Sequence, residues 1–110
     1  MLGSKEEIMT QVEIVSCDEK QLLIALKGEI DSGNADEFYK TVCAAYDNSP
    51  ASLVFSCEEL EFIDSTTLGT FVKLLKKVKT DGFGLKLRAL QAKIKKLFLI
   101  CSLDTVMEIE

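Results

Sequence analysis

Four consecutive polar residues, Asp64, Ser65, Thr66 and Thr67, are the part of this sequence best suited to chemistry. They follow an apolar segment and directly precede a periodic helical pattern, so they are expected in a loop at a helix N-terminus. There, their oxygens can accept hydrogen bonds from backbone N–H groups that lack an intrahelical partner, and the hydroxyls lie at the positive end of the helix dipole. Local chemistry leaves two explanations open: these residues only cap the helix, or one hydroxyl has a further role.

The helix that follows is predicted from apolar residues that recur every three to four positions. They are Leu68, Phe71, Val72, Leu75 and Val78. Lysines fall on or near the other face, at Lys73, Lys76, Lys77 and Lys79, and they gather toward the C-terminal half, where they complement the helix dipole. Gly82 and Gly84 are expected to end the helix, because glycine tolerates the left-handed geometry of a C-terminal cap.

Other reactive groups are scarce. The chain has no histidine, which removes the usual general base and any Ser–His or Cys–His nucleophile pair. Residues 82–84 (Gly-Phe-Gly) lack the later glycine of a dinucleotide-binding loop. The cysteines, Cys17, Cys43, Cys57 and Cys101, are scattered without a C-x-x-C pair, which favours buried reduced thiols over a zinc site. We therefore expect no catalytic residue, no metal and no cofactor, and an enzyme is the least favoured class.

Length and composition indicate one folded domain of 110 residues, with 47% apolar and 28% charged residues. The formal charge of -5 argues against nucleic acid as a partner, although basic residues concentrate between Lys73 and Lys96. No stretch approaches the roughly 18 consecutive apolar residues of a membrane span, and the first seven residues lack the apolar core of a secretory signal. We expect a cytoplasmic protein that binds neither nucleic acid nor a membrane.

Apolar patterns along the chain alternate between strand and helix spacing. Strands are predicted over residues 8–14, 22–26, 53–55, 85–89 and 106–109, and helices over residues 35–45, 68–78 and 91–101. The continuous apolar run at 22–26 predicts a strand buried on both faces. This order predicts a largely parallel sheet built with right-handed crossovers, and a first strand that is antiparallel through a hairpin.

Two of the predicted strand-to-helix loops carry acidic and hydroxyl side chains. Glu29, Asp31 and Ser32 lie in the first loop, and residues 63–67 form the second. The carboxyl ends of parallel strands meet at one edge of a sheet, where the ligand or partner surface usually lies. We therefore expect both loops at the same edge. Asp31 has two open explanations, because it either caps the helix that it precedes or takes part in recognition.

Three spaced motifs resemble those of STAS domains, and particularly of bacterial anti-sigma factor antagonists. Residues 62–69 (Phe-Ile-Asp-Ser-Thr-Thr-Leu-Gly) resemble the family signature Asp-Ser-Ser/Thr-Gly-Leu-Gly after an apolar strand. Residues 28–31 (Gly-Glu-Ile-Asp) resemble the Gly-Glu-Leu-Asp that precedes the family's first helix. Residues 97–104, which end in Cys-Ser-Leu-Asp, resemble its Leu-x-x-x-Gly-Leu-Asp ending. The resemblance covers essentially the whole chain.

The resemblance implies a single α/β domain over residues 1–110, with a mixed, mostly parallel sheet and helices packed mainly on one face. Family members bind an anti-sigma factor that is also a serine kinase, and so release a sigma factor. The kinase then phosphorylates the serine that follows the motif aspartate, and a protein phosphatase restores the binding form. By position that serine is Ser65, with Thr66 as the alternative.

The resemblance also implies a partner-binding surface around this serine. Its residues are Glu29, Asp31, Ser32, Ile63, Asp64, Ser65, Thr66, Thr67 and Leu68. Asp31 and Asp64 are expected to flank the serine and to help the kinase recognise it. Thr67 departs from the family glycine, so we expect it to fill space near a partner's backbone and, with Thr66, to compete as a phosphoacceptor. Relatives often carry one more helix after the last strand, so part of the sheet is expected to be less covered.

A second class of function stays open, that of a binding module without phosphorylation. STAS domains also occur in anion transporters, stress-sensing assemblies and lipid-transport complexes, where they dock on a partner or bind a nucleotide. A free-standing chain argues against the transporter form only. Modification by a cognate kinase distinguishes the two classes.

Overall fold

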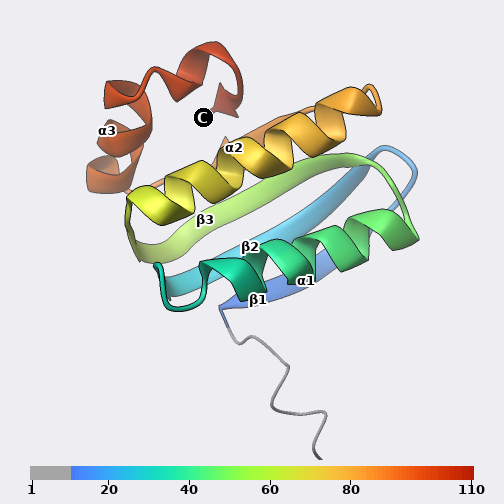
Figure 1. Ribbon diagram of the computed structural model, residues 1–110, viewed down its shortest axis with the longest axis horizontal. Helices are drawn as coiled ribbons and strands as arrows, with labels where there is room; N and C mark the ends of the chain where they lie inside the picture. Colours follow the sequence, from blue (N-terminus) through green and yellow to red (C-terminus); the bar gives the residue numbers. More distant parts are fainter. Residues whose placement is uncertain (1–10) are drawn as a thin grey trace, which may run out of the picture.

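The computed structural model describes residues 11–110, which form a sheet with helices on one side (Figure 1). The strands are β1 (Val12–Cys17), β2 (Gln21–Ile30), β3 (Ser52–Ile63), β4 (Leu85–Arg88) and β5 (Glu108–Ile109). The helices are α1 (Ala35–Asn48), α2 (Ser65–Thr80) and α3 (Ala92–Ile100), followed by a short 3₁₀ helix, η2 (Leu103–Thr105). The predicted order of strands and helices is confirmed. Residues 8–10 of the first predicted strand lie outside the described residues.

The sheet has the order β1-β2-β3-β4-β5. β1 pairs antiparallel with β2, and the other neighbouring strands pair parallel, which confirms the predicted mixed, mostly parallel sheet. Ile30 and Ile63 are register partners at the carboxyl ends of β2 and β3. The loops that lead into α1 and α2 therefore start side by side at one edge of the sheet, as predicted.

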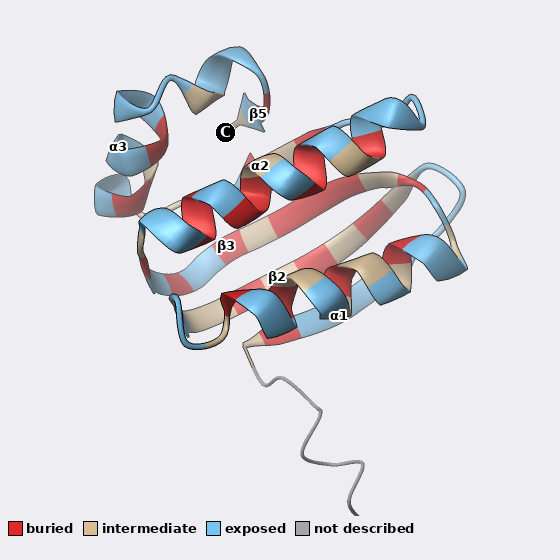
Figure 2. Cartoon of the chain, in the orientation of Figure 1, coloured by how far each residue is buried: buried red, intermediate tan, exposed pale blue. Residues whose placement is uncertain are grey.

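A cluster of aromatic rings between the helices and the sheet holds these layers together. The ring of Phe71 on α2 makes edge contacts with Phe38 on α1, Phe55 on β3 and Phe98 on α3, with centroid distances of 5.3, 5.3 and 5.4 Å. All four rings are fully buried. Because all three helices contribute to this cluster, they pack against the same face of the sheet, and their buried sides point toward it (Figure 2).

The outer face of the sheet, opposite the helices, is covered by no helix of residues 11–110. Along β2, Leu22, Ile24 and Leu26 are buried against the helices, whereas Leu23 and Ala25 on the outer face are only half-buried. The prediction that residues 22–26 are buried on both faces is therefore wrong. An apolar run also occurs in a strand with one face covered, provided that its neighbours shield part of the other face.

The limits of all five strands differ from those predicted, and β2 continues to Ile30, which places Glu29 in the strand and not in the loop. β3 continues to Ile63, well beyond residue 55, because buried Cys57 and Leu60 keep facing the core while acidic residues point outward. β4 ends at Arg88 because Ala89 adopts a left-handed conformation, with a φ of 61°. β5 is shorter than residues 106–109, since the Met107 N–H still donates to the Leu103 carbonyl of η2 at 3.0 Å.

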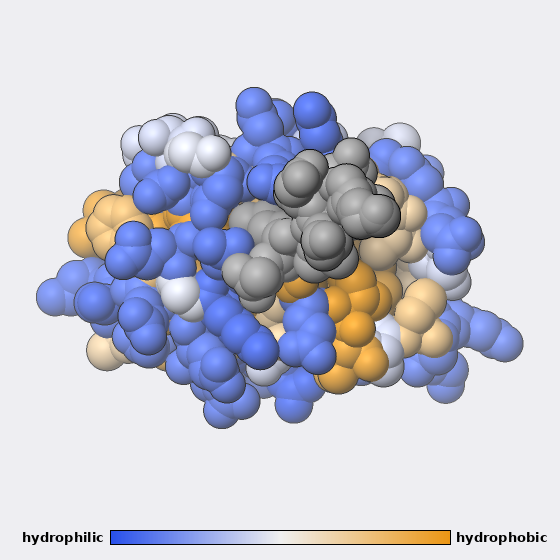
Figure 3. Space-filling view, turned by 90° about the horizontal axis from the view of Figure 1, so that it is seen from below, coloured by the Kyte–Doolittle hydropathy of each residue, from blue (hydrophilic) through white to orange (hydrophobic). Residues whose placement is uncertain are grey.

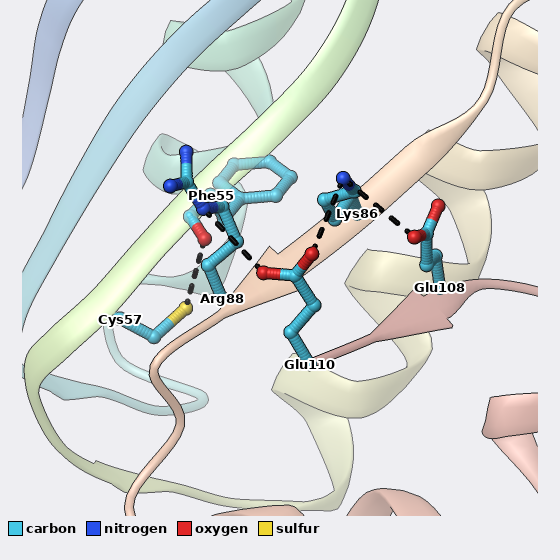
Figure 4. Close-up of polar contacts among 6 residues, drawn as sticks. All are labelled: Phe55, Cys57, Lys86, Arg88, Glu108 and Glu110. Atoms are coloured by element: carbon cyan, nitrogen blue, oxygen red, sulfur yellow. Dashed lines mark hydrogen bonds and ion pairs between the residues drawn. The ribbon is translucent and has the colours of Figure 1, made fainter.

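Charged side chains on the outer face link β5 to β4 (Figure 4). Lys86 Nζ lies 3.6 Å from a carboxylate oxygen of Glu108 and 3.4 Å from one of Glu110. Arg88 Nε lies 3.6 Å from the other Glu110 oxygen. The Glu110 N–H also donates to the Leu87 carbonyl at 2.8 Å. Exposed ion pairs contribute at most about 1 kcal/mol each, so the backbone bonds and Met107 packing anchor this edge as much as the charges do.

The cysteines are free thiols in different environments. Cys57 is buried and donates to the Phe55 carbonyl at 3.7 Å (Figure 4), and burial raises the pKa of its thiol to about 12. Cys43 is half-buried, whereas Cys17 and Cys101 are exposed. The prediction of buried thiols is therefore wrong for the last two, because Cys17 lies on an edge strand and Cys101 follows the last turn of α3.

Candidate functional site

The helix α2 begins at Ser65, and Asp64 caps it. The Asp64 backbone is extended, with a φ of -119°, and its Oδ1 accepts a hydrogen bond from the Thr67 N–H at 3.0 Å. Its carbonyl accepts the first helical bond, from the Leu68 N–H at 3.1 Å. This geometry confirms the capping role predicted for Asp64. It places the Ser65 side chain, which is exposed, in the first turn of the helix.

Asp64 also connects the two loops at this edge of the sheet. Its second carboxylate oxygen, Oδ2, accepts a hydrogen bond from the Ser32 N–H at 2.9 Å. Ser32 lies in the β2–α1 loop, 32 positions earlier in the chain. One carboxylate thus caps α2 and also fixes the neighbouring loop, so the role of Asp64 is not limited to capping.

Thr67 lies inside this junction and not on its surface. Its side chain is fully buried. Its Oγ1 lies 2.6 Å from the Ile30 carbonyl oxygen and 3.0 Å from Asp64 Oδ1, and both oxygens accept from this single hydroxyl. The expectation that Thr67 fills space near a partner and competes as a phosphoacceptor is wrong, because its hydroxyl is enclosed between the end of β2 and the cap of α2.

The Asp31 side chain stabilises a turn and does not cap α1. Its Oδ1 accepts from the Gly33 N–H at 2.9 Å, whereas Asn34 occupies the N-cap position of α1. The Asn34 side chain completes the loop, since its Oδ1 accepts from the Asp31 N–H at 2.8 Å and its Nδ2 donates to the Glu29 carbonyl at 3.1 Å. The sequence analysis missed Asn34, although asparagine just before a helix is a known turn and cap signal.

The residues of the predicted partner-binding surface differ in their exposure. Glu29, Ser32, Ser65 and Thr66 are exposed, and Asp31 and Asp64 are half-buried. Ile63, Thr67 and Leu68 are buried, with exposed fractions of 2%, 0% and 9%. These three side chains are held inside the junction, and Ile63 also lines the groove described below.

Hydrogen bonds to Asp64 favour the ionised form of its carboxyl group. The Thr67 N–H has the largest effect, and the Ser32 N–H and the Thr67 hydroxyl act in the same direction. Together they outweigh partial burial and lower the pKa of Asp64 below its ordinary value. A fixed negative charge therefore lies next to Ser65 at neutral pH.

An apolar groove that was not predicted from the sequence lies beside this junction. It has a volume of about 190 Å³ and is lined by Glu61, Phe62, Ile63, Lys93, Ile94 and Leu97. Phe62 belongs to the predicted signature, and Leu97 belongs to a predicted helix and to the third motif, but neither was predicted to be exposed. Four consecutive apolar residues at 97–100 were a signal, because one face of a helix cannot bury all of them.

The described residues contain no group of three or more His, Cys, Asp or Glu side chains placed to hold a metal ion. No helix within residues 11–110 is long and apolar enough to cross a membrane. The site therefore consists of the two loops, the start of α2 and the adjacent groove.

Comparison with known proteins identifies the family. The family model described as the STAS domain matches residues 10–110. The chain belongs to the STAS domain family. Among relatives of this STAS domain, the anti-sigma-B factor antagonist of Bacillus subtilis (strain 168) is 30% identical over 95 residues, which cover 86% of each chain.

Solved structures show the same STAS fold. The anti-sigma factor antagonist SpoIIAA in its unphosphorylated form superimposes with a TM-score of 0.78, at 17% identity and over 90% of this chain and 87% of that one. The phosphorylated form of SpoIIAA from Bacillus gives a TM-score of 0.71, at 17% identity and over 90% of both chains. The five-stranded mixed sheet with its helices is thus the fold of this STAS family.

Proposed function

We propose that this chain is an anti-sigma factor antagonist that is controlled by phosphorylation at Ser65. In the unphosphorylated state it binds an anti-sigma factor that is also a serine kinase, and the sigma factor held by that protein is released. The kinase then phosphorylates Ser65 and the complex separates, and a protein phosphatase restores the binding form. The observation that carries this proposal is the exposed Ser65 at the first position of α2, next to the ionised Asp64.

The Ser65 hydroxyl is available for reaction. Its side chain is exposed, and it makes no hydrogen bond with another residue of the described chain. Thr66 is exposed as well and remains the alternative acceptor, whereas Thr67 is enclosed. The Bacillus subtilis relative is an anti-sigma-B factor antagonist, and SpoIIAA has been solved with and without its phosphate, which supports a switch of this kind here.

Electrostatics explain how one phosphate could separate the complex without unfolding the domain. Phosphorylation adds about -1.5 to -2 charges at pH 7. In the free domain the N-terminus of α2 favours such a charge by roughly 0.3 to 1 kcal/mol. In a complex the phosphate must lose water beside the carboxylates of Asp64 and Asp31, whose negative charges repel it. The repulsion therefore acts mainly on the bound state.

Binding of Ser65 variants to the anti-sigma factor kinases of the same organism tests this proposal. We expect Ser65→Ala to bind as tightly as the parent but to stay bound in the presence of ATP. We expect Ser65→Asp to bind at least about tenfold more weakly, because its charge mimics part of the phosphate. Thr66→Ala distinguishes the two acceptors, because it should still dissociate on addition of ATP if Ser65 is the one that is phosphorylated. Equal affinities of Ser65→Ala and Ser65→Asp would contradict the proposal.

A docking module without phosphorylation predicts a different result. In that case Ser65→Ala and the parent would respond identically to ATP, and no variant at this position would remain trapped on its partner. The same binding series therefore separates the two classes of function.

A further inference from the structure

The Phe62–Leu97 groove, lined by the six residues given above, is an apolar surface that the fold leaves open. Phe62 is 46% exposed and Leu97 is 37% exposed. Leu99 and Ile100 on the same helix are 45% and 71% exposed. Seen from below, apolar side chains reach the surface at the left end of the molecule, where Figure 1 places the β3–α2 junction and α3 (Figure 3).

α3 is held firmly enough to give this groove a fixed shape. Ile94 and Phe98 are buried, and the Phe98 ring lies 5.4 Å from the ring of Phe71 in the core. Leu97 lies between these two anchors in sequence and lines the groove on the side of α3 that faces β3. The groove therefore does not depend on a mobile loop, and its apolar side chains remain exposed in the free domain.

The helix that forms one side of the groove, α3, is rich in lysine. α3 carries Lys93, Lys95 and Lys96, and none of them makes an ion pair with another described residue. The chain as a whole has a formal charge of -5. The groove lining itself holds one charge of each sign, Glu61 and Lys93, so the excess of positive charge comes from the rest of α3. A partner complementary to α3 would thus present an apolar side chain flanked by carboxylates.

The groove is continuous with the Ser65 site along the chain and in space. Ile63 lines the groove and directly precedes Asp64, the cap of α2. Of the nine residues predicted to contact a partner, only Glu29, Ser32, Ser65 and Thr66 are fully on the surface. A specific interface takes about 20–30 residues on each side, so a partner that covers Ser65 must extend beyond these loops.

We propose that the Phe62–Leu97 groove is the anchoring half of the interface with the anti-sigma factor kinase. It receives an apolar side chain from an acidic segment of that protein, while the Ser65 loop carries the phosphorylation switch. This inference rests on the proposed function and assigns separate tasks to two parts of one surface. The groove provides affinity in the complex, and phosphorylation of Ser65 separates the complex.

Leu97→Ser and Phe62→Ser test the anchor, because both side chains are already partly exposed and their removal leaves the core intact. We expect each variant to bind the purified anti-sigma factor kinases of the organism about tenfold more weakly, as for the anchor residues of other interfaces. Val15→Ser is the matched control, because Val15 is 50% exposed on β1, away from Ser65. It should bind within about twofold of the parent.

Phosphorylation kinetics add a second measurement, made at a temperature where unfolding curves show Leu97→Ser and Val15→Ser to be equally and fully folded. With Leu97→Ser as the protein substrate, we expect the kinase to show a raised KM and an unchanged kcat, because the groove does not contact the reacting hydroxyl. Lys93→Glu with Lys96→Glu changes charged residues and leaves the apolar side chains of the groove in place. Against an acidic partner this double variant should slow association and make it rise with added salt, and it provides a test if the apolar variants unfold.

The outcomes separate this inference from the proposed function. If Ser65→Asp weakens binding and the groove variants bind like Val15→Ser, the groove inference is wrong and the switch remains. If the parent neither binds the kinases nor is phosphorylated, both are wrong. If light scattering shows that the parent self-associates and that Leu97→Ser abolishes this without changing kinase binding, the occupant is a second copy and the inference is overturned.

Discussion

Thr67→Val tests whether the buried hydroxyl links the end of β2 to the cap of α2. Valine keeps the shape and β-branching of threonine but removes the donor that lies 2.6 Å from the Ile30 carbonyl. The enclosed side chain admits no water to replace this donor. Loss of such a bond with a buried acceptor left unpaired costs about 1–3 kcal/mol, and we expect about 2 kcal/mol here. For a chain of this length that corresponds to a Tm lower by about 8 °C.

Thermal and urea unfolding measure this change against two controls. Thr66→Val removes a neighbouring hydroxyl that is exposed and has no partner among the described residues, so it should change stability by less than about 0.5 kcal/mol. Thr67→Ser keeps the hydroxyl and loses one buried methyl group, which costs about 0.8 kcal/mol. We therefore expect Thr66→Val to be the most stable of the three variants, Thr67→Ser to be intermediate and Thr67→Val to be the least stable. Equal stability of Thr66→Val and Thr67→Val would refute the proposed link.

Two further predictions concern ionisable groups. The lowered pKa of Asp64 means that its stabilising contribution is present above the unfolded pKa and is lost as the pH falls through the folded pKa. Between pH 2 and 7, the free energy of unfolding of Asp64→Asn should therefore fall less with decreasing pH than that of the parent. An equal pH dependence of the two proteins would contradict this. Tyr46 donates to Asp81 at 2.7 Å, and burial and this bond raise its pKa to about 12. Its contribution should be complete below the unfolded pKa of about 10 and lost toward pH 12. Tyr46→Phe should remove the step near pH 12 from an ultraviolet titration, whereas the step of Tyr39, whose pKa is raised chiefly by its hydrogen bond with Cys43, should remain.

The order of strands and helices was predictable because it rests on local patterns. The spacing around Phe71 predicted a helix, and polar residues before it predicted the cap at Asp64. The resemblance of three motifs predicted the family, and the geometry of parallel strands predicted that the two loops meet at one edge. These features depend on residues that are near one another in the sequence, or on the general behaviour of parallel strands.

The inward direction of Thr67 could have been predicted, and the reason lies in the helix period. Thr67, Phe71, Leu74 and Val78 are spaced by four, three and four positions, and all are essentially fully buried. The core stripe of α2 thus begins in the cap itself. Ser65 and Thr66 are exposed whereas Thr67 is buried, although the three form one polar run in the sequence.

Other features could not be predicted from the sequence because they depend on what packs against a segment. The run at residues 22–26 looks the same whether the outer face of β2 is covered or open. Likewise, the run at 97–100 does not reveal that Phe98 turns to the core while Leu97 and Ile100 remain exposed. The bond between Asp64 and the Ser32 N–H joins segments 32 residues apart, and it follows only from the strand register.

The central claim is that Ser65 accepts a phosphate from an anti-sigma factor kinase. Intact mass measurement and peptide mapping, after incubation with the organism's own anti-sigma factor kinases and ATP, test it most directly. We predict one added phosphate, located on Ser65, and none on Ser65→Ala. A phosphate on Thr66 alone would move the switch by one residue. Absence of any phosphate with every one of these kinases would contradict the account and favour a docking module.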